Sequence, residues 1–163
     1  MIYRRLACIS VVLMLLAFPV SASMVSFLVV ETGLNEEIRS PQFSSLWEGG
    51  LMSVFYDAGH IVTNSPIGRM EKKPSNDLSG TIKADFDEAA EGGAEYFVLG
   101  FIEYQINGSA AVPVGMAIKL YKIDSQELIY ENNFPAGNGS SLNQEYQFAQ
   151  NAGRTLIPHI KDL

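Results

Sequence analysis

A group of polar and charged side chains follows the first two predicted strands of the chain. Strands are predicted at Ser26–Thr32 and Ile61–Thr63, and open α/β sheets bind their ligands at the carboxyl ends of such strands. The side chains expected at this edge, on connections 33–39 and 64–80, are Glu31, Asn35, Ser65, Arg69, Lys72 and Lys73. They predict a site for another protein or, as an alternative, for a small polar ligand.

Catalytic and metal-binding patterns are missing from the sequence. His60 and His159, the two histidines, are far apart, and Cys8 is the single cysteine, so imidazole and thiolate ligands are too few for a metal site. No Gly-x-Ser-x-Gly elbow and no Gly-x-x-x-x-Gly-Lys-Ser/Thr phosphate loop occurs. Glycoside hydrolysis needs two carboxylates across a cleft, and none of the 18 acidic residues stands out as such a pair. We therefore expect no catalytic residue, metal or cofactor, and a cell-wall hydrolase is the weakest hypothesis.

The N-terminal segment predicts export. Met1–Ser23 has Arg4 and Arg5, then the apolar run Leu6–Val20, then small residues, as in a secretory signal peptide that is cleaved after Ala22 or Ser23. An uncleaved anchor is the alternative, although the run is shorter than the ~20 apolar residues of a spanning helix. A lipobox cysteine would follow the apolar run, whereas Cys8 lies near its start. The prediction is a periplasmic or secreted protein with no stable membrane span.

Charge and cysteine content exclude several classes of partner and bond. The chain has 11 basic and 18 acidic residues, and loss of Arg4 and Arg5 with the signal leaves a net charge of −9. Nucleic acid is not expected as a partner, because binding it requires a concentrated basic surface. Because Cys8 would leave with the signal, the mature chain could form no disulfide.

Hydrophobic periodicity predicts one α/β domain over residues 24–163, with a single mixed sheet and the element order β-α-β-α-β-β-β-α. Ser40-Pro41 starts the first helix, which Gly59 ends, and Gly49-Gly50 within it predicts close approach to the sheet. The remaining predicted elements are a helix at Thr81–Glu91, strands at Glu95–Ile106, Val112–Leu120 and Glu127–Phe134, and a helix after Ser141 with Leu142, Phe148, Ala149, Ala152, Leu156 and Ile160 as its apolar residues. Right-handed crossovers give the strand order 2-1-3, and a meander adds strands 4 and 5. The polar stretch Asn64–Gly80 is predicted to be an irregular, functional loop.

Two segments resemble a group of bacterial envelope domains. Ala89–Gly100 (AAEGGAEYFVLG) is similar to the stretch that enters their central strand, and Leu120–Leu128 (LYKIDSQEL) is similar to their hairpin. The group includes the N-terminal domain of TolB, the curli secretion protein CsgG and the LpoB activator of peptidoglycan synthases. The resemblance implies a small, non-enzymatic envelope domain that docks onto other proteins. A periplasmic small-ligand-binding protein remains the alternative.

Overall fold

The computed structural model describes residues 22–34, 42–108, 110–136 and 141–160. Its strands are β1 (Met24–Thr32), β2 (Ile61–Asn64), β3 (Gly68–Met70), β4 (Tyr96–Asn107), β5 (Ala110–Lys122) and β6 (Glu127–Phe134). Its helices are α2 (Gln42–Asp57), α3 (Gly80–Glu91) and α4 (Leu142–Arg154), with a 3₁₀ turn, η1, at Ile157–His159. The predicted signal segment up to residue 21, Asn35 and the predicted Ser40-Pro41 helix start lie outside the described residues.

All strands belong to one mixed sheet with the order β2-β1-β4-β5-β6. The β1 strand pairs in parallel with β2 and β4, whereas β4, β5 and β6 form an antiparallel meander. The predicted α/β class and strand order are thereby confirmed. Asn107 and Gly108 turn the chain from β4 into β5, and Gly108 has a φ of 64°, which glycine adopts without strain.

One strand lies where the sequence predicted only irregular structure. Gly68–Met70 forms β3, which pairs in parallel with Val30–Thr32 of β1 on the same edge as β2. The segment has no apolar alternation that would reveal a strand. Its register places Arg69 opposite Glu31, and opposite charges in this position stabilise a strand pair.

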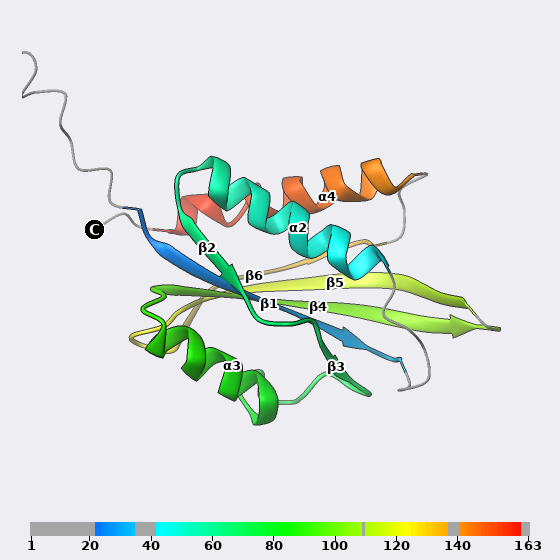
Figure 1. Ribbon diagram of the computed structural model, residues 1–163. Helices are drawn as coiled ribbons and strands as arrows, with labels where there is room; N and C mark the ends of the chain where they lie inside the picture. The colour runs from blue at the N-terminus through cyan, green and yellow to red at the C-terminus, as the bar shows by residue number, and fades with distance from the viewer. Residues whose placement is uncertain (1–21, 35–41, 109, 137–140, 161–163) are drawn as a thin grey trace, which may run out of the picture.

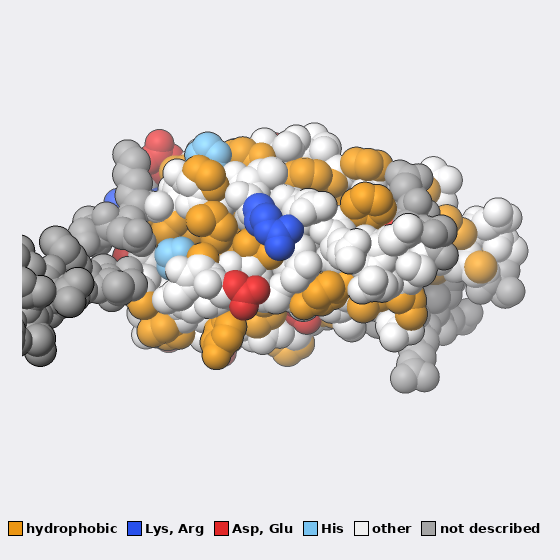
Figure 2. Space-filling model, turned by 90° about the horizontal axis from the view of Figure 1, so that it is seen from above, with side chains coloured by type: hydrophobic (Ala, Val, Ile, Leu, Met, Phe, Trp, Pro, Cys, Tyr) orange, Lys and Arg blue, Asp and Glu red, His pale blue; other side chains and the backbone are white. Residues whose placement is uncertain are grey.

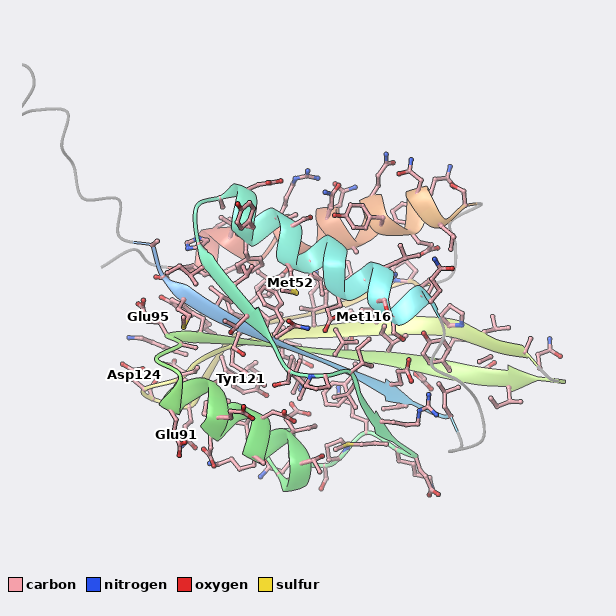
Figure 3. The ribbon with its side chains drawn as sticks, viewed as in Figure 1. Met52, Glu91, Glu95, Met116, Tyr121 and Asp124 are labelled. Carbon is pink, nitrogen blue, oxygen red and sulfur yellow. The ribbon has the colours of Figure 1, made fainter. Side chains whose placement is uncertain are left out.

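Helices cover the two faces of the sheet unequally (Figure 1). Both α2 and α4 lie on one face, whereas α3 lies on the other and covers only part of it. In Figure 3, Met116 of β5 lies on the α2 side and Tyr121 of the same strand on the α3 side, as expected from the alternation of side chains along a strand. The strands β1 and β4 are buried along most of their length because helices pack on both sides of them.

The glycines of α2 allow close approach to α4 and not to the sheet, which corrects the sequence prediction. A Cβ added at Gly50 would lie 2.6 Å from Ala149 Cβ and 2.9 Å from the Tyr146 carbonyl oxygen, both in α4. A Cβ at Gly49 would meet only Tyr146 Cε2, at 3.8 Å. The two helices therefore meet backbone against backbone at Gly50.

The α4 helix starts as predicted and ends earlier. Ser141, after which the helix was predicted to begin, is its N-cap: the Ser141 Oγ accepts a hydrogen bond from the Gln144 backbone N–H. The helix ends at Arg154, before Leu156 and Ile160, which were predicted on its apolar face, and the chain continues into η1. Leu142 and Phe148, predicted on its apolar face, are 52% and 44% exposed, because α2 covers only the stripe that contains Ala149 and Ala152. No described helix combines the length and apolar character that a membrane span requires.

Candidate functional site

A buried polar network lies behind the predicted binding edge. The carboxylate of Glu31 is fully buried and accepts hydrogen bonds from Arg69 Nη2 at 2.8 Å and Nε at 3.2 Å. Ser44 of α2 donates its hydroxyl proton to Glu31 Oε1 at 2.7 Å, and Tyr104 Oη lies 2.7 Å from Ser44 Oγ. Because Ser44 has a single proton to donate, Tyr104 is the donor in that pair.

The network connects four elements, and the Glu31 carboxylate accepts hydrogen bonds from two of them, α2 and β3. It joins β1, β3, the first turn of α2 and the end of β4. Burial raises the pKa of Tyr104 well above its usual range, so its hydroxyl stays protonated and can donate. Glu31 and Arg69 were predicted to line a binding crevice. The structure brings them together as an ion pair that fixes β3 to β1.

A hollow with a volume of about 470 Å³ lies on the opposite face of the sheet, beyond the end of α3. We call it the Lys72–Lys73 hollow; its lining includes Glu71, Lys72, Lys73, Phe101, Glu103, Gly115, Ala117 and Asn133. Phe101, Ala117 and Asn133 are register partners on β4, β5 and β6. The hollow exists because Gly115 has no side chain and Ala117 has only a methyl group at this place in the sheet. Charged side chains surround it.

The segment after β3 forms one wall of this hollow. The Gly33 N–H donates to the Glu71 carbonyl oxygen at 3.2 Å, which ties the segment to the end of β1. Lys73 Nζ lies 4.9 Å from the centre of the Phe101 ring, within the range of a cation–π contact. Ser65 is half-buried on the β2 side and does not line the hollow. Of the six predicted site residues, Lys72 and Lys73 therefore lie in its wall.

Lys119 holds the same segment farther along, and sequence reasoning missed it. Its Nζ pairs with Asp77 and, at 3.2 Å, with Glu131 Oε1, and Tyr121 Oη donates to Asp77 at 2.9 Å. Burial lowers the pKa of Lys119, but the two carboxylates outweigh it and raise that pKa overall. Lys119 alternates with the apolar Ile118 and Leu120 along β5 and is nevertheless buried, because the 71–79 segment covers it. The feature of the sequence that could have indicated this contact is the acidic residue Asp77 in the polar segment, which offers Lys119 a partner of opposite charge.

The lining of the Lys72–Lys73 hollow is suited to binding. Within the described part of the chain, no group of three or more His, Cys, Asp or Glu side chains could hold a metal ion. The hollow has a small apolar floor and a wall with two exposed lysines. Such a surface can accept one apolar side chain and pair with a neighbouring carboxylate.

Comparisons with known proteins place the fold. No family model and no curated protein match the chain. The PelC dodecamer from Paraburkholderia phytofirmans is similar over 85% of this chain and 88% of its own, with 14% identity and a TM-score of 0.51. TolB from Acinetobacter baumannii covers 85% of this chain and 29% of its own, at 14% identity and a TM-score of 0.45. The LpoB C-terminal domain from Salmonella enterica covers 78% and 93%, at 16% identity and a TM-score of 0.39. At such identities the likeness concerns the fold alone, and the chain shares the fold of PelC. TolB and LpoB, the proteins that the motifs at 89–100 and 120–128 resemble, are also among the similar solved structures.

Proposed function

We propose that this protein is an exported, non-enzymatic domain of the cell envelope that binds another envelope protein through the Lys72–Lys73 hollow. The observation that carries the proposal is the end of the sheet that no described helix covers: α3 stops short of it, and the Glu31–Arg69 and Lys119–Asp77 pairs hold the 68–77 segment beside it. A wall fixed at both ends presents Lys72 and Lys73 in a defined position.

The composition of the hollow indicates what kind of segment would bind. Gly115 and Ala117 leave room above the sheet, and the exposed Lys73 ammonium lies in the wall, 4.9 Å from the centre of the Phe101 ring. An apolar anchor flanked by an acidic residue would fill the space and pair with the lysine. Burial of one Leu or Phe side chain contributes about 1.5–3 kcal/mol, which suits a specific and reversible contact.

Sequence and comparison support a role in protein association. The predicted signal segment implies export, and the motifs at 89–100 and 120–128 resemble envelope docking domains. PelC, which has the same fold, is described as a dodecamer, so this fold forms protein–protein contacts in at least that protein. A small-ligand carrier is the alternative for the same hollow.

Site-specific crosslinking tests the proposal. The full chain is expressed in its native host with a photo-crosslinking amino acid at position 72, and at position 122 as the control, since Lys122 is a lysine at the far end of β5. We expect one dominant envelope protein to crosslink at 72 and not at 122. Ala117→Trp should fill the hollow and abolish that crosslink without unfolding the domain, which circular dichroism would verify.

The outcomes are distinguishable. A crosslink at 72 that survives both Ala117→Trp and Lys73→Glu would place the contact elsewhere and refute the hollow as the site. A ligand-dependent rise in melting temperature, with no protein crosslinked, would favour the carrier alternative. Substitutions are preferable to deletion of the segment, because Arg69 in β3 holds the buried Glu31.

A further inference from the structure

The exposed surface of α2, α4 and η1, which we call the helix face, has few charges for a strongly acidic chain. The charged residues of α2 and α4 are Glu48, Asp57, Glu145 and Arg154. Glu145 is buried and accepts a hydrogen bond from Trp47 Nε1 at 3.2 Å, and Glu48 Oε1 accepts one from Asn64 of β2 at 3.2 Å. Asp57 and Arg154 therefore remain as the exposed charges of the two helices.

Large apolar side chains of the same two helices are also exposed. Tyr56 is 70% exposed and Phe148 is 44% exposed, although both are in helices that bury their other side. Figure 2 shows this face from above: hydrophobic and uncharged side chains cover most of it, and a basic and an acidic side chain lie near each other in its middle. Aromatic residues with few charges are typical of the central part of protein interfaces.

Asp57 and Arg154 line one cavity between the ends of the two helices. The cavity has a volume of about 350 Å³, and its other lining residues are Val54, Ala58, Ile157 and Pro158. Arg154 Nη1 donates to Asn151 Oδ1 at 2.8 Å, and neither Asp57 nor Arg154 forms an ion pair with another described residue. The cavity thus combines an apolar interior with one charge of each sign.

We propose that the helix face binds a second copy of this chain in a two-fold symmetric contact, with Asp57 of each copy facing Arg154 of the other. A chain with a net charge of −7 repels its own copies over most of its surface, so self-association requires a region where charge is scarce. In a two-fold contact, residue i meets residue j and residue j meets residue i, so one acid and one base on the same patch are self-complementary. Tyr56, adjacent to Asp57, would then enter the apolar cavity of the partner copy.

Charge reversal combined with sedimentation velocity tests this contact. The protein is purified after expression of the full chain, and its dimer dissociation constant is measured for wild type, Asp57→Lys, Arg154→Glu and the double swap. Each single reversal turns two attractive pairs into two repulsive ones, so we expect dissociation constants about 10- to 30-fold higher. The double swap restores opposite charges and should return the constant to within about threefold of wild type.

Matched controls separate this effect from a change in net charge. Lys122→Glu and Asp124→Lys make the same charge changes at an exposed pair in the β5–β6 turn and should leave the constant unchanged. A wild-type protein that stays monomeric at about 0.5 mM refutes the proposal, as do single reversals that behave like their controls. The result is independent of the proposed hollow, because crosslinking at position 72 probes the opposite face of the sheet.

Discussion

The contact between α2 and α4 allows one packing effect to be measured in isolation, because adjacent glycines in α2 differ in what lies opposite them. Alanine at either position gains about 1 kcal/mol of helix propensity. At position 49 the new methyl would lie 3.8 Å from Tyr146 Cε2, an ordinary contact. At position 50 it would lie 2.6 Å from Ala149 Cβ, about 1 Å inside the usual carbon–carbon separation of 3.5–4.0 Å.

The expected magnitudes follow from this geometry. Gly49→Ala should stabilise the protein by about 1 kcal/mol. Gly50→Ala has the same propensity gain, but overpacking costs about 1–3 kcal/mol because the α4 backbone must move away. The difference between the two variants isolates the packing cost, about 2 kcal/mol, since the propensity term is common to both.

Urea unfolding followed by circular dichroism measures this difference. With a slope of about 2 kcal/mol/M, the midpoints of the two variants should differ by about 1 M, with Gly49→Ala the higher. Equal slopes would show that the unfolded state has not changed. If both alanines raise the midpoint equally, α2 and α4 do not meet backbone against backbone, and the close contact of the two helices at Gly50 is refuted.

Two further predictions concern buried and partly buried charges. Arg69→Met should lower the free energy of unfolding by about 3 kcal/mol, because the buried carboxyl group of Glu31 loses both guanidinium hydrogen bonds and its ion-pair partner; a loss below about 1 kcal/mol in urea unfolding would contradict this. Burial raises the pKa of Glu48 above its ordinary 4.5, and the hydrogen bond from Asn64 opposes this only in part. Folding therefore favours the protonated form of Glu48. The resulting contribution to the free energy of unfolding is fully present below the ordinary pKa and is lost as the pH rises through the raised pKa of the folded state. Glu48→Gln should therefore raise the urea midpoint at pH 7 and leave it unchanged at about pH 3.5; the opposite ranking would show that Glu48 is stabilised as an anion.

Periodicity and connection rules were sufficient to predict every strand of the described sheet except β3. The strand at 26–32 and the first half of the strand at 95–106 are apolar on both faces, which is typical of strands in the middle of a sheet covered by helices. Right-handed crossovers then permit a single order for the parallel strands. The short strand β3 could not be predicted, because it depends on a long-range pair, Arg69 with Glu31, and not on local apolar pattern.

The candidate site was predicted only in part for a related reason. Side-chain type placed Glu31 and Lys72 in one group, but it could not show that the sheet lies between them. Glu31 faces α2 and hydrogen-bonds Ser44, whereas Lys72 lies in the wall of the hollow on the other face. The alternation of side chains along β1 predicts which face of the sheet Glu31 lies on. For an irregular segment such as the one with Lys72, the face depends on long-range contacts, for example the hydrogen bond from the Gly33 N–H to the Glu71 carbonyl oxygen.

The two proposed surfaces lie on opposite faces of one sheet, which makes their uses compatible. The helix face is formed by α2 and α4, and the Lys72–Lys73 hollow lies beyond α3. If two copies meet through their helix faces, the sheets lie outside the shared helices, and each hollow points away from the contact. The dimer then presents two equivalent hollows in opposite directions. Such a pair can hold two partner molecules at once, or one partner with two copies of its docking segment, and divalent binding of the second kind would be tighter than either single contact.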